Sequence, residues 1–221
     1  MKYYAIIVGG GSGTRMQSAT AKQFLLLKNK PVLMHTLTAF YNSSFNPEII
    51  VVIHPALHEI WEQLCLSYNF TIPHVLIKGG TQRFHSVRNG LMAIKDDGIV
   101  AIHDAVRPLV SQNLISHTFE MATANGNAVA SIKPSDSVRK LKGDQQSKVL
   151  NRADLVLVQT PQVFEIGQLR KAYQQSYQAK FTDDASVVEK AGFKINLVEG
   201  ERNNLKITYP EDLELASYLC K

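Results

Sequence analysis

A glycine-rich segment with two cations beyond it follows the first apolar run of the chain. It reads VGGGSGTRMQSATAKQF from Val8 to Phe24, and its cations are Arg15 and Lys22. Glycines let the backbone approach a ligand closely, and the N–H groups of such a loop can surround an anion. Each charged contact to a polyphosphate would contribute about 1.5–3 kcal/mol. The residue types therefore indicate a phosphate-binding loop. The structural alternative is a strand-to-helix turn with solvated charges.

Two common glycine motifs for nucleotide binding do not fit this loop. The dinucleotide pattern G-x-G-x-x-G fails because its last position is Thr14 when counted from Gly9 and Met16 when counted from Gly11. The P-loop pattern needs a Gly-Lys pair, which the chain lacks. What remains is a glycine loop whose cations lie beyond it.

A second candidate is the segment HDAVRP, in which Asp104 follows the apolar run of residues 99–103. Such an aspartate can bind a divalent metal or a ribose hydroxyl, and it can equally be a turn residue paired with Arg107. Parallel sheets bind ligands beyond the carboxyl ends of their strands. Because the glycine loop and Asp104 both follow predicted strands, we expect them to lie close together.

Further candidates are weaker when each is taken alone. In GGTQRFHSV, a glycine turn opens a helix whose Ser86 could read a base edge, although a plain helix start is the favoured explanation when the segment is taken alone. Thr160 precedes a proline in an extended segment, and Lys206 lies in a strand-like stretch before the last helix. His54 and His58 have a metal-like spacing, but no acidic residue completes a zinc motif.

Apolar runs alternate with amphipathic stretches along most of the chain. This order predicts an α/β protein with a mainly parallel sheet and helices on both faces. Ser111 should cap a helix that buries Leu114, Ile115, Thr118, Phe119 and Ala122, and Gly192 should end another helix. A capping box of Thr208, Pro210 and Glu211 should begin the last helix. Strands are expected at residues 3–8, 49–53, 74–77, 99–103, 128–132 and 194–198, and other helices at residues 31–41, 56–68, 82–95 and 182–191.

The regular order breaks at residues 133–152. The segment SVRKLKGDQQSKVLNR alternates apolar and polar residues around Gly143 and Asp144, which is typical of a hairpin. It is too polar for a core. We expect a protruding β-arm on a single domain that spans residues 1–221, and the arm is either mobile or covered by a partner subunit.

Composition narrows the class of partner. The chain has 221 residues, a formal net charge of +5 and only two cysteines, Cys65 and Cys220. A basic balance suits nucleic acid, a membrane surface or phosphorylated small molecules. The basic residues are scattered, which argues against nucleic acid, and no apolar run has the length of a membrane span. The cysteine usage and the lack of a signal-like leader predict a cytoplasmic protein.

Taken together, the motifs resemble the 2-C-methyl-D-erythritol 4-phosphate cytidylyltransferase family of non-mevalonate isoprenoid biosynthesis. The similarity covers nearly the whole chain in the family's order. The matching segments are GGGSGTRM, AKQF, GGTQRFHSV, HDAVRP, NRADLVLVQTPQVF, TDDAS and VEGERNNLKITYPEDL.

The resemblance implies a Rossmann-like nucleotidyltransferase fold, a homodimer formed through the β-arm, Mg²⁺ as cofactor, and CTP and a polyol phosphate as substrates. It also implies a role for each matching residue. Nucleotide contacts would come from Gly9, Gly10, Gly11, Gly13, Gly80, Ser86 and Asp104, of which Gly80 and Ser86 recognise cytosine and Asp104 also meets the metal. Catalytic charge would come from Arg15, Lys22, Arg152 and Lys206, and further substrate contacts from Arg107, Ser137, Thr160 and Thr182.

Three departures from the family pattern stand out. Gly9-Gly10 replaces the usual Ala-Ala, Ala21 replaces a proline before Lys22, and Ser137 replaces a threonine. Two other functions remain open. One is a ribitol-5-phosphate cytidylyltransferase, which belongs to a sister family. The segments TDDAS and NRADLVLVQTPQVF favour methylerythritol phosphate over ribitol phosphate. The other is a catalytically silent nucleotide-binding regulator, which would not need the four catalytic cations.

Overall fold

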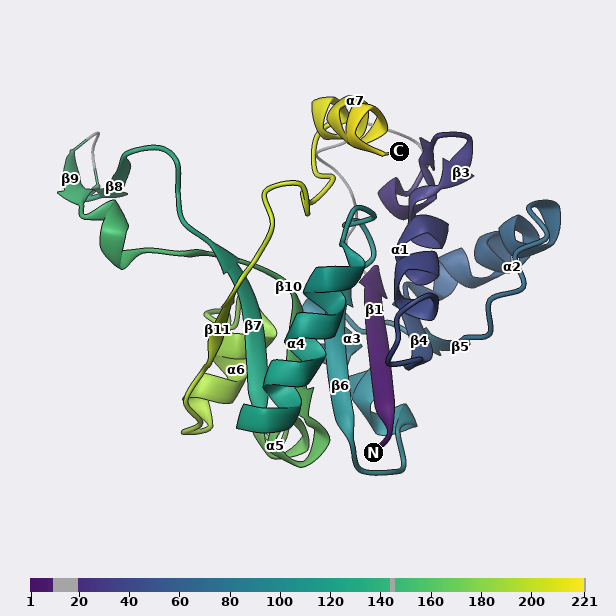
Figure 1. Cartoon of the computed structure of the whole chain (residues 1–221), viewed down its shortest axis with the longest axis horizontal. Coiled ribbons are helices and arrows are strands. Elements are labelled where there is room, and N and C mark those ends of the chain that lie inside the picture. Colours follow the sequence, from purple (N-terminus) through teal and green to yellow (C-terminus); the bar gives the residue numbers. More distant parts are fainter. Residues whose placement is uncertain (10–19, 144–145, 221) are drawn as a thin grey trace.

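A seven-stranded sheet forms the centre of the protein in a computed structural model, which describes residues 1–9, 20–143 and 146–220. The strand order is β11-β7-β10-β6-β1-β4-β5, with helices on both faces (Figure 1). Its strands are β1 (Tyr3–Gly9), β4 (Glu48–Ile53), β5 (Val75–Lys78), β6 (Ile99–Asp104), β7 (Asn127–Ile132), β10 (Leu157–Glu165) and β11 (Leu197–Glu199). The helices are α1 (Val32–Tyr41), α2 (His58–Ser67), α3 (Arg83–Ala93), α4 (Gln112–Asn125), α5 (Ile166–Ala172), α6 (Asp184–Lys190) and α7 (Pro210–Leu219).

The sheet is mainly parallel, which confirms the predicted α/β class. Strand β1 pairs in parallel with β4 and β6, β4 with β5, and β7 with β11. The exception is β10, which runs antiparallel to both β6 and β7. The sequence indicated only an extended segment around Thr160. The chain leaves β7, passes through the arm and returns beside β7, and a reversal of this kind produces antiparallel neighbours.

The core has two layers, one on each face of the sheet. In β1, Ala5 and Ile7 pack on the face covered by α1 and α4, whereas Ile6 and Val8 pack on the face covered by α3, α5 and α6. Successive side chains of a strand point to opposite faces. A strand buried on both faces must therefore be apolar throughout, as this run is.

Helix α4 confirms the prediction made for it. The Ser111 hydroxyl accepts a hydrogen bond from the Leu114 N–H at 3.0 Å, which is the predicted cap. All five residues predicted for its inner face are buried. The helix ends at Gly126, whose φ of +85° suits a glycine.

Helix α7 begins at Pro210 as predicted, but the predicted capping box is wrong. The N-cap residue is Tyr209, and the third helical residue is Asp212, whose Oδ2 accepts hydrogen bonds from the backbone N–H groups of Thr208 and Tyr209, both at 2.8 Å. A carboxylate in the first turn reaches back to free N–H groups, so the acidic residue one position further along takes this role instead of Glu211. Helix α6 corresponds to the helix predicted at residues 182–191. It starts after Asp183 and ends before Gly192, whose φ is +91°.

The β-arm forms a separate two-stranded sheet, β8 (Val138–Leu141) and β9 (Ser147–Leu150). Lys142 N–H donates to the Gln146 carbonyl at 2.9 Å, and Gly143 has a φ of +67°. Figure 1 shows this hairpin projecting from the β7 side of the protein, away from β1. The predicted hairpin is confirmed. No helix among the described residues is long and apolar enough to cross a bilayer.

Candidate active site

The carboxyl ends of β1 and β6 lie side by side, as the sequence predicted. Val8 is in register with Asp104, and the Ala105 N–H donates to the Val8 carbonyl at 2.9 Å. A Cβ atom added to Gly9 would lie 3.0 Å from Cγ2 of Ile53 and 3.1 Å from Cβ of Ala105. The ends of β1, β4 and β6 therefore meet closely at Gly9, which has no side chain.

Most of the glycine loop lies outside the described residues. This applies to the predicted ligand contacts Gly10, Gly11, Gly13 and Arg15. The structure describes the loop's first residue, Gly9, and resumes at Thr20.

The segment after the loop is fastened to the end of β1. Lys22 begins a short 3-10 turn, Lys22–Phe24, and the buried Gln23 side chain donates to the Gly9 carbonyl at 3.0 Å. The next residue, Phe24, stacks on Trp61 with ring centroids 5.9 Å apart. Ala21 has a φ of −57°, close to the value that proline would impose. The backbone at Ala21 is therefore one that a proline could also adopt.

Asp104 at the end of β6 is nearly buried and surrounded by cations. Its Oδ2 lies 2.9 Å from Nζ of Lys206 and 3.3 Å from Nε of Arg107, and its Oδ1 lies 3.6 Å from Nε of Arg83. Burial raises the pKa of Asp104, but Lys206, Arg83 and Arg107 outweigh burial and hold the pKa far below its usual value. The described part of the site therefore contains a permanent carboxylate with three cations around it.

Packing beneath the site brings Lys206 to Asp104. Ile207 N–H donates to the Val106 carbonyl at 2.9 Å, and both residues belong to one buried apolar cluster with Ala216 of α7. The segment before α7 is thereby fixed against the loop after β6. The sequence suggested a strand-like stretch around Lys206, but the structure assigns this residue to no strand and shows it in an ion pair with Asp104.

Arg107 and Thr160 are both close to Asp104. Arg107 pairs with Asp104, as the turn interpretation anticipated, and its Nη1 also donates to the Asn204 carbonyl at 2.7 Å. The Thr160 hydroxyl accepts a hydrogen bond from the Asp104 N–H at 3.1 Å, and only 4% of Thr160 is exposed. Asn204 Nδ2 donates to the Thr160 carbonyl at 2.8 Å. These contacts fix the backbone of Asp104, and the substrate contact of Thr160 stays a prediction.

Arg83 is the site residue that sequence reasoning missed. It is the first residue of α3, where a cation opposes the helix dipole, and this misfit was the available signal. Besides Asp104, it pairs with the fully buried Asp184 of α6, its Nη2 lying 2.7 Å from Oδ2. These two partners lie far from Arg83 in the sequence, so nothing local identifies them.

The second glycine turn is held closed by Ser86. The Ser86 hydroxyl accepts from the Gly80 N–H at 3.0 Å and donates to the Gln82 carbonyl at 3.2 Å. A Cβ on Gly80 would come 2.4 Å from Cβ of His85, so the turn requires glycine there. The Gly79 N–H donates to the Ile53 carbonyl at the end of β4. The turn therefore lies at the same edge of the sheet as Gly9, and cytosine recognition stays a prediction.

The remaining predicted substrate residues are exposed. Ser137 and Arg152 belong to the arm and its base, and Thr182 precedes α6. Arg152 Nη1 donates to the Ser135 carbonyl at 2.6 Å. Because the arm projects away from β1 (Figure 1), the structure does not bring Ser137 and Arg152 into the cluster around Asp104.

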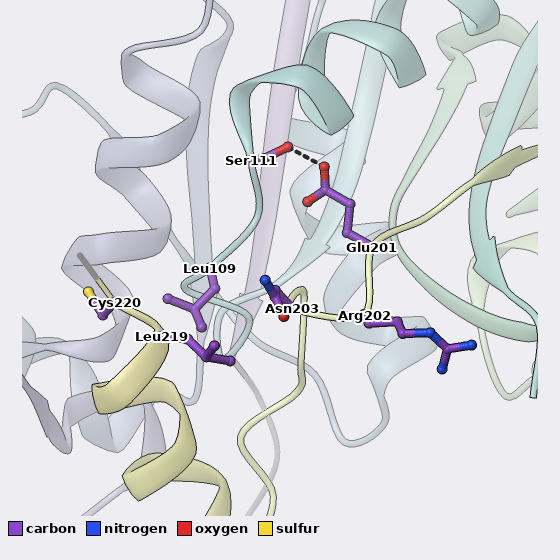
Figure 2. Close-up of a pocket in the computed structure, with 7 residues that line it drawn as sticks. All are labelled: Leu109, Ser111, Glu201, Arg202, Asn203, Leu219 and Cys220. Carbon is purple, nitrogen blue, oxygen red and sulfur yellow. Dashed lines mark hydrogen bonds between the residues drawn. The ribbon is translucent and has the colours of Figure 1, made fainter. Parts of the chain in front are cut away.

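An open pocket of about 600 Å³ lies beside the last helix (Figure 2). Its lining residues are Leu109, Ser111, Glu201, Arg202, Asn203, Leu219 and Cys220. Ser111 donates to Glu201 across it. The pocket shares no lining residue with the Asp104 cluster, although Asn204 and Lys206 follow closely in the chain. Strand ends and charged contacts therefore define the candidate site better than this pocket does.

Comparisons with known proteins identify the family of this chain. The family model for 2-C-methyl-D-erythritol 4-phosphate cytidylyltransferase matches residues 3–221. A protein of that name from Bacteroides fragilis is 46% identical over 215 residues, which are 97% of this chain and 98% of the relative. One from Phocaeicola vulgatus is 45% identical over 219 residues, 99% of this chain and 100% of the relative.

Solved structures give the same result. The crystal structure of the Francisella tularensis 2-C-methyl-D-erythritol 4-phosphate cytidylyltransferase has a TM-score of 0.83 and 33% identity, with 99% of each chain covered. That of the protein of the same name from Thermus thermophilus has a TM-score of 0.81 and 31% identity, with 99% of this chain and 98% of that chain covered. The chain described here belongs to the 2-C-methyl-D-erythritol 4-phosphate cytidylyltransferase family.

Proposed function

We propose that this protein transfers CMP from CTP to 2-C-methyl-D-erythritol 4-phosphate and releases pyrophosphate, a step of non-mevalonate isoprenoid biosynthesis. The observation that carries the proposal is the family match over residues 3–221, in a chain whose strand ends hold a carboxylate among three cations. Such a cluster suits the binding of phosphate groups. Its members come from segments far apart in the sequence, which the fold brings together.

The proposed reaction needs charge and alignment more than it needs a base. An oxygen of the sugar phosphate forms a bond to the α-phosphorus of CTP, and the bond from that phosphorus to the bridging oxygen breaks. A phosphate monoester is already largely dianionic at neutral pH, with a second pKa of about 6, so its oxygen needs no deprotonation. Cations placed around the α-phosphorus then stabilise the added charge of the transition state.

The nearby histidine does not fit the role of a base. His103 precedes Asp104 in β6 and is fully buried, with Nε2 lying 3.2 Å from the Arg107 carbonyl. Burial lowers the pKa of His103 to about 4. The imidazole is therefore neutral and enclosed, and it supports the backbone of Arg107.

The cations of the site differ in freedom. Arg107 is 9% exposed and held by the Asn204 carbonyl, whereas the Lys206 side chain is 39% exposed and pairs with Asp104 through its terminal Nζ. Of these two, Lys206 is therefore the cation with the freedom to turn from Asp104 to a substrate phosphate. We assign it to the phosphate of the acceptor, and Lys22 and Arg15 to the triphosphate.

Magnesium is part of the proposal, and the described residues fit an ion held by a single carboxylate together with substrate phosphates. The described residues contain no group of three His, Cys, Asp or Glu side chains placed to hold a metal ion. Asp104 offers one carboxylate, and Mg²⁺ is commonly held by one or two carboxylates together with substrate phosphates. Bound in this way, magnesium would neutralise charge on the triphosphate. Asp104 would hold the magnesium ion, and Lys206 would move away from Oδ2 of Asp104 when the ion binds.

A homodimer formed through the arm completes the proposed site. The arm carries large exposed apolar side chains, with Leu141 79% and Val149 60% exposed, which a partner subunit would cover. It also carries Ser137, with Arg152 at its base, which this chain does not place near its own Asp104. A two-fold dimer would bring these residues to the neighbouring site.

Pyrophosphate release separates this function from the two alternatives. The purified protein is given CTP and magnesium with 2-C-methyl-D-erythritol 4-phosphate or with ribitol 5-phosphate. We expect rapid release with the first substrate and slow release with the second. Preference for ribitol 5-phosphate would indicate the sister activity. CTP binding without turnover of either substrate would indicate a regulator.

A further inference from the structure

A line of polar contacts runs from Asp104 away from the sheet edge, and it is buried except at Arg83, whose side chain is 28% exposed. Asp104 faces Arg83, Arg83 pairs with Asp184, and Asp184 Oδ1 accepts a hydrogen bond from the Tyr173 hydroxyl at 2.6 Å. These residues come from β6, α3, α6 and the end of α5. The line therefore joins Asp104 to a layer of helices that the proposed chemistry does not otherwise use.

Asp184 is an acidic residue at a helix start, which is common, but its complete burial is unusual. It has no exposed surface, and both of its oxygens are occupied, Oδ2 by Arg83 and Oδ1 by Tyr173. A buried carboxylate is strongly unfavourable unless it is paired and hydrogen-bonded. Its neighbour Ala185 donates its N–H to Oε1 of the buried Gln162 at 2.8 Å, which ties this end of α6 to β10. Asp184 is therefore a fixed anchor.

Tyr173 holds the second oxygen of Asp184, Oδ1, through its hydroxyl. It is 4% exposed, and its ring stacks on Phe84 with centroids 4.7 Å apart. Burial, and then the charge of Asp184, raise the pKa of Tyr173 well above its usual value, so the hydroxyl keeps its proton and donates a hydrogen bond to Asp184. The phenol thus fixes Asp184 without adding charge.

Arg83 transmits this rigidity to the site because its guanidinium is a planar fork. Its Nη2 is held at 2.7 Å by Asp184, and its Nε lies 3.6 Å from Oδ1 of Asp104. Lysine has a single terminal nitrogen and cannot present this geometry to both carboxylates. Asp184 also neutralises the charge of Arg83, so Arg83 acts on the orientation of Asp104 more than on phosphate attraction.

We propose that Arg83, anchored by Asp184 and Tyr173, is a positioning residue for cytidylyl transfer that fixes the Asp104 carboxylate through its Oδ1. Oδ2 already has Arg107 and Lys206. When Lys206 turns to a substrate, Arg83 and Arg107 keep the carboxylate plane in place. The inference rests on the cytidylyltransferase activity proposed above.

A double-mutant cycle between Arg83 and Asp104 tests whether one acts through the other. The variants are Arg83→Gln, Asp104→Asn and the double variant, measured by pyrophosphate release at saturating substrates. Because a misplaced group typically lowers the rate by up to about 100-fold, we expect Arg83→Gln to lower kcat at least about tenfold. In the Asp104→Asn background the same change should cost less than about twofold, since coupled residues are not additive.

Tyr173→Phe gives a second, gentler test, because it removes one hydroxyl and keeps the stacked ring. We expect a several-fold fall in kcat, little change in the KM for CTP, and no additional fall in the Arg83→Gln background. Arg83→Lys should not restore the rate. Arg170→Gln is the matched control. Arg170 pairs with Asp97 at 2.9 Å before the amino end of β6, and its loss should leave kcat unchanged.

The outcomes distinguish the two proposals. If the falls in kcat caused by Arg83→Gln and Asp104→Asn multiply fully in the double variant, the positioning role is overturned while the activity stands. The same conclusion follows if Tyr173→Phe lowers the melting temperature but not kcat, because a purely structural contact would do that. Failure of the unaltered protein to release pyrophosphate would instead contradict the proposed function, and the positioning role would fall with it.

Discussion

Lys206 and Asp104 form an ion pair of 2.9 Å between distant segments of the chain. The lysine precedes the last helix, and the aspartate ends the strand beside β1. Removing the lysine leaves the carboxylate with two arginines and removes the most exposed of the three cations around Asp104. We predict that Lys206→Ala lowers kcat/KM for the sugar phosphate by roughly 10²–10³, with a smaller effect on CTP.

Lys95 is the matched control for that change. It is an exposed lysine of the loop between α3 and β6, near the amino end of the sheet strands. Lys95→Ala should leave both kinetic constants unchanged. Equal losses in the two variants would show that net charge matters and that the pair with Asp104 does not.

The charge beyond the glycine loop should act mainly on the chemical step. Lys22 begins a turn that is fastened to β1 through Gln23 and the Gly9 carbonyl. We expect Lys22→Ala and Arg15→Ala each to lower kcat about 10²–10³-fold at saturating CTP, because their charge is needed most as the α-phosphorus becomes pentavalent. Normal turnover by both variants would remove them from the catalytic set.

Base selection should depend on the turn that Ser86 closes. A methyl group on Gly80 collides with His85, so Gly80→Ala must displace the turn and lengthen the hydrogen bond to Ser86. We expect a large rise in the KM for CTP and a loss of preference for CTP over UTP. Gly167→Ala is the control, since Gly167 lies in α5 and its nearest neighbour would be 3.4 Å away. Equal kcat/KM for CTP and UTP in the unaltered protein would contradict cytosine recognition.

Shared active sites can be tested by mixing two inactive proteins. Lys22→Ala removes a residue of the body, and Arg152→Ala removes one at the base of the arm. If each arm serves the neighbouring subunit, exchange produces dimers with one intact site, and activity should reappear. Arg152→Lys should remain inactive because the arginine binds phosphate through two nitrogens. Subunit exchange is followed by tagged subunits, and exchange without recovery would assign the arm to its own chain or to none.

Acid should destabilise the fold first through His103. Its pKa is about 4 in the folded protein and about 6.5 when unfolded, so the unfolded state binds the proton between these values. The free energy of unfolding should therefore decrease as the pH falls from about 6.5 to about 4, by on the order of 2–3 kcal/mol. Urea denaturation at several pH values measures this. His103→Gln should flatten the profile in that window, and an unchanged slope would contradict it; His35, whose pKa burial also lowers, contributes to the remainder.

The parts of the fold that could be predicted are those with a local cause. Strands β1, β4 and β6 are buried on both faces and therefore read as unbroken apolar runs, and Ser111 caps its own helix. The direction of β10 could not be read, because an apolar strand looks alike in parallel and antiparallel pairing. The capping box of α7 is predicted at Thr208 and Glu211 and lies one residue further along, at Tyr209 and Asp212, because acidic residues occur at consecutive positions there and only geometry selects between them.

The candidate site shows the same division. Gly9 and Asp104 could be placed together because both follow predicted strands, and the structure confirms their proximity. For Arg83 the sequence offers only the misfit of a cation at a helix start, and it does not identify the partner Asp184, which lies 101 positions further along in a different helix. Long-range pairing of this kind leaves no periodicity in the sequence.

The stacking of Phe24 on Trp61 gives the protein an intrinsic optical reporter. Trp61 is the chain's only tryptophan, is 1% exposed and donates its Nε1–H to His74 at 2.9 Å. Phe24 belongs to the same short turn as Lys22. Any rearrangement of that turn on nucleotide binding therefore changes the surroundings of a single indole, so its emission reports the event without an added dye.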